Sequence, residues 1–263
     1  MDQARVDLKP KNLDLKSRKK SEGGLWETIK IIPQALLIAL VVRTLLFQPF
    51  NIPSGSLIPT LLIGDYLFVS KYSYGYSKHS IPFSPPVFSG RIWGTLPKRG
   101  DIAVFKLPKD NSTDYIKRVI GLPGDRIQVV EGVLQINGRA VKRERIDDYK
   151  TTDAFGQTIS VPQDTETLPE GVAHPVIERD GDRGFWDNTD VYVVPTDHFF
   201  MMGDNRDNST DSRDQASVGF VPYENLVGRA EIIFFSIDES SSAWRIWDWP
   251  WTVRWNRMLK PIR

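Results

Sequence analysis

Ser56 and Lys117 are the two residues of this 263-residue chain whose types and surroundings point most directly to chemistry. Ser56 ends the turn Pro53-Ser54-Gly55-Ser56, and a serine becomes a useful nucleophile only when a base takes its proton. A lysine can be that base when an apolar site lowers its pKa towards neutrality. Most neighbours of Lys117 within residues 115–120 are apolar. The three histidines have no recognisable catalytic context, so this pair predicts a serine nucleophile with a lysine base.

The composition excludes several other kinds of site. The chain contains no cysteine, which rules out disulfides, thiol catalysis and cysteine metal sites. Its three histidines are scattered along the sequence, and we therefore expect no metal and no cofactor. The formal net charge of +1 gives no argument for nucleic acid as a partner. Hydrophobic residues make up 40% of the chain, enough for a sizeable core.

Residues 25–50 form the only hydrophobic stretch of membrane length, since about 20 residues are needed to cross a bilayer. A cleaved secretory signal is disfavoured because bulky residues, not small ones, follow Val42. A buried core helix is the other alternative. We expect a retained signal anchor at 25–49. The basic residues within a polar tail at 1–24 predict that this tail stays in the cytoplasm while the rest is exported.

Short segments rich in β-branched and aromatic residues follow the hydrophobic stretch. Examples are residues 66–69, 102–105 and 232–235, and such runs separated by turn residues are typical of strands. Asn137-Gly138 after an apolar run predicts a hairpin turn. No long amphipathic helix pattern appears beyond the hydrophobic stretch, so the rest of the chain is predicted to be mainly β.

The C-terminal segment at 243–263 combines tryptophans with basic residues. Tryptophan prefers the membrane interface, and arginine prefers anionic head groups. The segment is too polar to span a bilayer, and Pro250 interrupts any helix. Two interpretations stay open. The tryptophans contact a membrane interface, which we favour, or they pack on the β core.

Four blocks in this order, at 52–65, 99–105, 114–125 and 202–213, resemble the type I signal peptidases of bacteria. The Ser-Gly-Ser turn alone would be weak evidence, whereas four ordered blocks behind a hydrophobic segment are specific. Leu57 departs from the family pattern, which usually has Met there, but the two side chains are similar in size and polarity. The resemblance implies a membrane-bound serine endopeptidase that cleaves signal peptides from exported preproteins. The alternatives are a related processing peptidase of narrow specificity and a non-catalytic, membrane-anchored envelope domain for assembly or binding.

The resemblance also implies a fold and a location. The fold is a β catalytic domain with an inserted β subdomain, preceded by one transmembrane helix. On this sequence the catalytic domain takes residues 50–127 and 195–242, and the insert takes 128–194. The expected partners are preproteins and the lipid bilayer, with the chain acting as a monomer. The expected place is the bacterial inner (plasma) membrane, crossed once, with the catalytic domain on the periplasmic or extracellular side.

Roles for individual residues follow from the same resemblance. Ser56 is the nucleophile and Lys117 the general base. The hydroxyl of Ser54 helps the backbone N–H of Ser56 to stabilise the oxyanion. Ser209 orients Lys117 through a hydrogen bond, and a salt bridge between Asp211 and Arg213 supports the site.

An extended substrate is read by strand addition, with alternate side chains entering pockets. Shallow apolar pockets beside the catalytic pair would accept alanine and reject bulkier residues. The resemblance assigns such pockets to the small residues at positions −1 and −3 of the preprotein. For Ile52 and Val104, an ordinary place in the core is an equally open interpretation. The predicted substrate-binding residues are Phe50, Ile52, Pro53, Leu57, Val104, Asp114, Tyr115 and Ile116.

Overall fold

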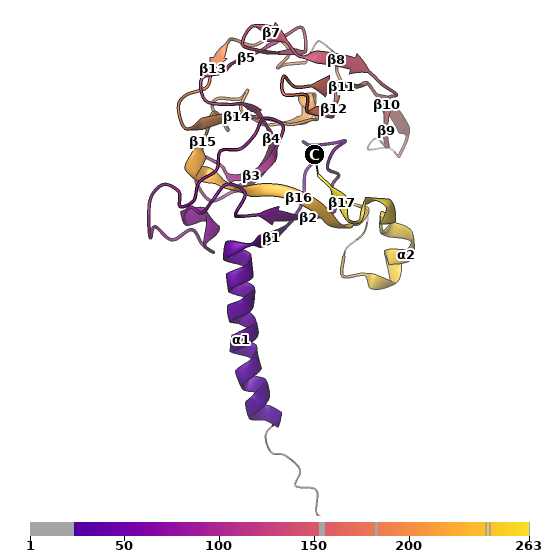
Figure 1. The fold of residues 1–263 in the computed structure, drawn as a ribbon. Helices are drawn as coiled ribbons and strands as arrows, with labels where there is room; N and C mark the ends of the chain where they lie inside the picture. Colours follow the sequence, from indigo (N-terminus) through magenta and orange to yellow (C-terminus); the bar gives the residue numbers. More distant parts are fainter. Residues whose placement is uncertain (1–23, 153–155, 182–183, 240, 242, 263) are drawn as a thin grey trace, which may run out of the picture. The chain divides into compact units, whose positions relative to one another are not determined.

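The computed structural model describes residues 24–152, 156–181, 184–239, 241 and 243–262, with side chains from residue 29 onward (Figure 1). The predicted basic tail at 1–24 lies outside these residues except for Gly24. Contacts between residues divide the chain into two units, 1–40 and 41–263. All the strands belong to the second unit.

The first described element is the helix α1 (Gly24–Leu45), and the strand β1 (Phe47–Asn51) follows it almost directly. Arg43 lies in the last turn of α1, where a cation interacts favourably with the helix dipole. The segment 25–49 therefore contains a helix and the start of a strand. Among the described residues, no helix is both long and apolar enough to cross a membrane. The predicted anchor at 25–49 stays a prediction.

An antiparallel sheet of eight strands forms the centre of the second unit. Its long strand β16 pairs with β2 on one side and β3 on the other, and β4 links β3 to β14. The predicted mainly β class is confirmed. The strands after β1 are β2 (Asp65–Ser70), β16 (Leu226–Ser236), β3 (Ile102–Lys106), β4 (Asp114–Gly121), β14 (His198–Met202), β15 (Val221–Pro222) and β17 (Lys260–Pro261).

Three smaller sheets come from the part of the chain between β4 and β14, and most of their strands are labelled across the upper part of Figure 1. The first contains, in spatial order, β13 (Tyr192–Val193), β5 (Arg126–Val130), β6 (Val133–Ile136) and β7 (Arg139–Ala140). The second contains, in spatial order, β12 (Ala173–Ile177), β11 (Gln163–Thr167) and β8 (Lys142–Arg145). The third pairs β10 (Thr158–Val161) with β9 (Tyr149–Thr152).

The hairpin predicted at Asn137-Gly138 is confirmed. Both residues have positive φ, 55° and 75°, and they connect β6 to β7 in register, with Ile136 opposite Arg139. Two consecutive left-handed residues match the twist of a hairpin, and asparagine followed by glycine tolerates them best.

The strand β14 is buried on both faces. Phe199 and Met201 belong to one apolar cluster, and Phe200 and Met202 belong to another. Successive side chains of a strand point to opposite faces, which explains why this strand is a continuous apolar run. The second cluster also contains residues of β5 and β6. The sheet that contains β5 and β6 therefore shares a core with the central sheet, and the predicted boundaries of the insert at 128–194 stay a prediction.

The C-terminal segment runs beside β16 in short helices and ends in β17. Trp249 packs its ring against Phe235 of β16, with 5.1 Å between ring centroids, and Arg257 pairs with the buried Asp65. Four other tryptophans, Trp244, Trp247, Trp251 and Trp255, are exposed. The short helices of the fold are η1 (Lys78–Ser80), η2 (Arg206–Asn208), η3 (Tyr223–Asn225), η4 (Ile246–Asp248), α2 (Trp249–Thr252) and η5 (Trp255–Arg257).

We expect Leu134→Ala to lower the free energy of unfolding by about 2–5 kcal/mol, the usual cost of a cavity in a core. Leu134 is 0% exposed and lies in the cluster that also contains Phe200 and Met202. Leu259→Ala is the control, because Leu259 is 69% exposed and its loss should cost less than about 0.5 kcal/mol. The measurement is urea unfolding followed by circular dichroism and by tryptophan fluorescence. A separate early transition in Leu134→Ala would show that β5 and β6 fold independently of the central sheet.

Candidate active site

Ser56 lies in the loop after β1, held against a segment almost 150 residues away. The backbone N–H of Asn205 donates to the Ser56 carbonyl oxygen (3.1 Å), and the Asn205 side chain donates to the Gly55 carbonyl oxygen (3.0 Å). A Cβ at Gly203 would overlap both Ser209 Oγ and the Ser56 carbonyl oxygen, so this close approach requires glycine. The two loops thus fix the backbone that carries the Ser56 hydroxyl.

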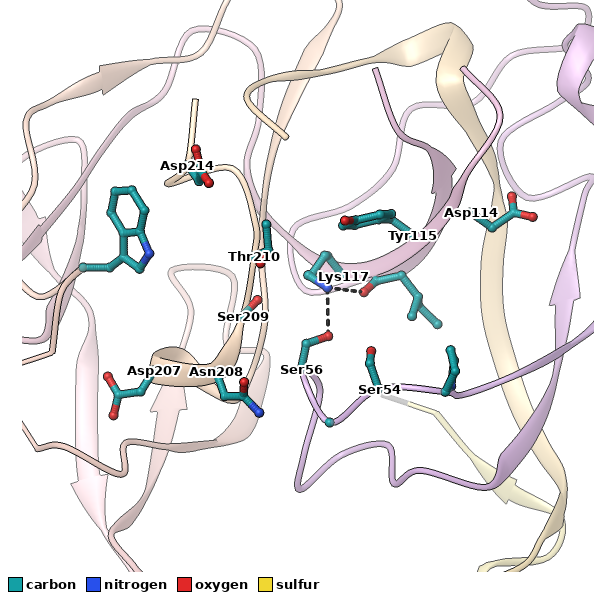
Figure 2. Close-up of a pocket in the computed structure, with 14 residues that line it drawn as sticks. Ser54, Ser56, Asp114, Tyr115, Lys117, Asp207, Asn208, Ser209, Thr210 and Asp214 are labelled. Atoms are coloured by element: carbon teal, nitrogen blue, oxygen red, sulfur yellow. Dashed lines mark hydrogen bonds between the residues drawn. The ribbon is translucent and has the colours of Figure 1, made fainter. Parts of the chain in front are cut away.

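Lys117 comes to Ser56 from the middle of β4. Its Nζ donates to Ser56 Oγ at 2.8 Å and to the Ile116 carbonyl oxygen at 3.2 Å, as the dashed lines in Figure 2 show. Its amine also lies 5.3 Å from the centre of the Tyr115 ring. Lys117 is only 4% exposed. The two residues singled out from the sequence are therefore in direct contact.

Burial changes the protonation of Lys117. It lowers the pKa of the Lys117 amine from 10.5 to about 8, with a smaller push in the same direction from Arg213. The carboxylates of Asp211 and Asp204 oppose this shift. A substantial fraction of Lys117 is then neutral near physiological pH, and a neutral amine can accept the Ser56 proton across the same 2.8 Å contact.

A cavity of about 540 Å³ opens over the pair. In Figure 2, Ser54 and Tyr115 lie to one side of Ser56, and Asp207 and Asn208 lie to the other. An extended chain can therefore pass the Ser56 hydroxyl with contacts on both sides. None of the three histidines lines this cavity in the described part of the chain. The lining residues are 53–56, 114–117, Trp186, 207–210 and Asp214.

The predicted substrate-binding residues divide into two groups. Pro53, Asp114, Tyr115 and Ile116 line the cavity. Ile52, Leu57 and Val104 are instead buried in the apolar core between β2, β3 and β16, and Phe50 packs against that core. These four are not among the residues that line the cavity, and their contact with substrate stays a prediction. Ile52, Leu57 and Val104 are at most 3% exposed, because their strands and loop turn these side chains away from the cavity.

Ser209, Asp211 and Arg213 lie close to the catalytic pair. Asp211 and Arg213 form a bidentate pair, with Nε to Oδ1 and Nη2 to Oδ2 both at 2.9 Å. Burial alone would raise the pKa of Asp211, but Arg213 holds it below its usual value. Ser209 lines the cavity, and its hydroxyl contributes to the low pKa of Asp211. Its predicted hydrogen bond to Lys117 is not formed among the described residues.

A second buried ion pair, between Arg118 and Asp204, lies behind the site and was missed from the sequence. The guanidinium contacts both carboxylate oxygens at 2.8 and 2.7 Å, and Thr60 donates to Asp204 at 2.5 Å. Arg118 follows Lys117 on β4 and so points to the opposite face. The pair therefore joins β4 to the loop before Asn205. A charged residue next to Lys117 in an otherwise apolar strand was the only signal in the sequence.

Trp186 was not predicted from the sequence either. It comes from the segment between β12 and β13, a long way along the chain from every predicted site residue, and it lines the cavity with Asp207, Asn208, Thr210 and Asp214. Trp186 is half-buried, and nothing in its local sequence distinguishes it from other aromatic residues. Among the described residues, no cluster of histidine and acidic side chains is suited to holding a metal ion.

Known proteins resemble this chain over most of its length. A family model for signal peptidases (peptidase S26) matches residues 25–235. The signal peptidase I of Rickettsia akari is 38% identical, over 95% of this chain and 97% of its own. That of Rickettsia typhi is 44% identical, over 76% of each chain.

A crystal structure of a signal peptidase I from Enterococcus faecalis is 25% identical, covers 51% of this chain and 97% of its own, and has a TM-score of 0.30. The family model covers more than half of the chain, and both Rickettsia enzymes exceed 30% identity. The chain therefore belongs to the signal peptidase family, whose members are serine endopeptidases that cleave signal peptides.

Proposed function

We propose that this protein cleaves signal peptides from preproteins with Ser56 as nucleophile and Lys117 as general base. The observation that supports this best is the 2.8 Å contact between Lys117 Nζ and Ser56 Oγ at the bottom of an open cavity. A lysine with a pKa of about 8 suits a general base better than an ordinary lysine, because catalytic efficiency is greatest near the operating pH.

The reaction then has two halves. Neutral Lys117 takes the proton of Ser56, and Oγ attacks the scissile carbonyl carbon to form a tetrahedral intermediate. As the C–N bond breaks, the Lys117 ammonium gives its proton to the leaving amine of the mature protein, and the signal peptide stays on Ser56 as an ester. Water deprotonated by Lys117 attacks this ester, and the proton returns to Ser56 Oγ.

The oxyanion of the intermediate needs donors on the wall that carries Ser56. The backbone N–H of Ser56 and the hydroxyl of Ser54 are our candidates, since both residues line the cavity. One such donor typically stabilises the transition state by about 3 kcal/mol. Asp211 and Arg213 act on Lys117 through charge, and Ser209 is a candidate to orient its amine during the reaction.

We propose specificity for small residues at −1 and −3. The apolar wall beside Ser56 consists of Pro53 and Ile116, and the side chains of Ile52, Leu57 and Val104 are packed into the core beneath it. We expect this packed apolar wall to favour a small side chain next to the scissile bond. The alternative of narrow specificity is tested by cleaving a panel of preproteins that share an Ala-x-Ala site but differ elsewhere. Membership of an enzyme family counts against the non-catalytic alternative.

We also propose that the protein works at a membrane surface, with its substrate held there by the signal peptide. The exposed tryptophans of the C-terminal segment support this proposal, because tryptophan prefers the interface between lipid and water. The proposal is independent of the catalytic assignment and has its own test below.

Ser56→Ala and Lys117→Met should each lower kcat/KM for a preprotein by at least about 100-fold, the lower end expected for loss of a general base. Met keeps the length and the apolar contacts of Lys117 but cannot accept a proton. The measurement is cleavage of a purified preprotein by gel assay, with circular dichroism to verify the fold. Retention of more than a tenth of the activity in Lys117→Met would refute the assigned base.

Activity should rise with pH through a midpoint near 8, because the active form needs neutral Lys117. Below this midpoint Lys117 gains a proton and activity falls. Burial also lowers the pKa of Lys71 to about 8, so the profile alone does not identify the group. Lys71→Met is the matched control, and it should keep the same midpoint in a kcat/KM profile. Loss of the midpoint in Lys71→Met would show that Lys71, and not Lys117, is the group that titrates near pH 8.

Arg213→Met and Asp211→Asn should move this midpoint in opposite directions. Arg213 lowers the pKa of Lys117 and Asp211 raises it, so the first variant shifts the midpoint up and the second shifts it down. Each leaves a buried charge without its partner, at a cost to stability of about 3–5 kcal/mol. The control is Arg229→Met, which breaks a pair with Glu231 outside the cavity and should leave the midpoint unchanged. Shifts of the same sign in both variants would contradict the account.

The C-terminal tryptophans should contribute to membrane binding. In sedimentation with anionic vesicles, replacing Trp244, Trp247 and Trp251 by serine should reduce the bound fraction, since all three are exposed. Trp249→Ser is the contrasting variant, because Trp249 packs on Phe235; it should lower stability more than vesicle binding. Equal vesicle binding by the triple variant and the unaltered protein would favour core packing alone.

A further inference from the structure

A second cavity, of about 200 Å³, lies between the end of α1, the loop around η1, and the turn from β3 to β4. Its lining includes Arg43, His79, Ser84, Lys106 and Asp114. Asp114 also lines the active-site cavity, but none of the proposed reaction steps uses the other four residues. The question is what chemistry this cavity serves.

The charges around the cavity are mostly positive. Arg43 and Lys106 line it, and Asp114, paired with Lys106 at 2.9 Å, is its only acidic lining residue in the described chain. Lys71 lies nearby and is only 1% exposed. Burial is the main cause that lowers the pKa of Lys71. Asp114 opposes this shift, and the positive charges of Arg43, Lys106 and Arg91 add to it. Several cations therefore repel one another here, with Asp114 as the one carboxylate in the lining and Glu224 acting on His79 from outside it.

Two polar side chains of the cavity wall, one buried and one exposed, lack an oppositely charged or hydrogen-bonding partner for a key group among the described residues. His79 is buried, and its Nε2 has no hydrogen-bond partner within the described residues. Its other ring nitrogen shares a 2.9 Å hydrogen bond with Ser84 Oγ. When Ser84 donates to Nδ1, the proton of the neutral ring lies on Nε2, which is then an unused donor. Arg43 likewise forms no salt bridge with any residue that the structure describes. An unpartnered buried donor is costly, and an anion in the cavity would satisfy it.

We propose that this cavity binds a phosphate group. Arg43 supplies a planar guanidinium suited to two phosphate oxygens, and Lys106 and His79 supply further donors. The phosphate can belong to an anionic phospholipid head group or to free inorganic phosphate. Phe83 favours the lipid. It lines the cavity and is fully exposed, so an apolar ring stands beside the site where acyl chains would begin.

The test uses the full chain with Ser56→Ala, in a neutral detergent, so that binding is read without catalysis. Isothermal titration calorimetry at constant ionic strength measures binding of inorganic phosphate, of short-chain phosphatidic acid and of short-chain phosphatidylcholine. Arg43→Gln and Lys106→Gln should each weaken binding of the phosphate-bearing anion by about tenfold, since a hydrogen bond to a charged group is lost. Lys109→Gln is the matched control, because Lys109 is exposed in the same turn but does not line the cavity.

Both sources of phosphate give interpretable outcomes. Tighter binding of phosphatidic acid than of inorganic phosphate identifies a lipid head group, and equal binding identifies the free anion as sufficient. Absence of binding by both anions overturns the proposal, as does an equal loss of affinity in Lys109→Gln. Unchanged unfolding temperatures of the three variants without ligand show that each is folded. Because binding does not depend on Ser56 or Lys117, failure here leaves the proposed function untouched.

Discussion

Burial of the Lys117 amine beside the Ser56 hydroxyl is the interaction on which the rest of the site depends. An ammonium group is far more stable in water than in an apolar site, so burial favours the neutral amine. That same burial keeps Nζ at 2.8 Å from Oγ, where a neutral amine can accept a proton. The position of Lys117 on β4, in the middle of the central sheet, makes this burial possible. The stability of the central sheet thus offsets the free-energy cost of burying the Lys117 amine.

Two buried carboxylates lie near enough to disfavour the neutral form of Lys117. Asp211 and Asp204 both raise the pKa of Lys117, and unopposed they would favour its charged form. Each is bound by its own guanidinium, Arg213 and Arg118, through two contacts of 2.7–2.9 Å. These pairs explain how acidic side chains can hold the loops around Ser56 without turning Lys117 back into an ordinary cation. On the proposed mechanism, we therefore expect loss of either arginine partner to disturb the protonation of Lys117.

The sequence was sufficient to single out Ser56 and Lys117, which the structure brings into contact, and to predict the mainly β class and the hairpin at Asn137-Gly138. Each rests on local patterns, namely a serine turn, a lysine among apolar neighbours and the turn preference of two adjacent residues. The burial of Ile52, Leu57 and Val104 in the core could not be predicted, because an apolar residue near Ser56 has the same appearance in a sequence whether it faces a cavity or the core. Arg118, Asp204 and Trp186 were missed because their roles depend on contacts between distant segments. The core that β14 shares with β5 and β6 was not predicted for the same reason.

The most direct test of this account is the pKa of Lys117 itself. The protein can be produced with lysine labelled by ¹³C at the ε position and titrated by NMR, with Lys117→Met to assign the signal and Lys71→Met to remove the second buried lysine. The account predicts a Lys117 titration midpoint of about 8, moving upward when Arg213 is replaced. A midpoint near the ordinary lysine value of 10.5 would mean that Lys117 stays charged beside Ser56 and is not the base.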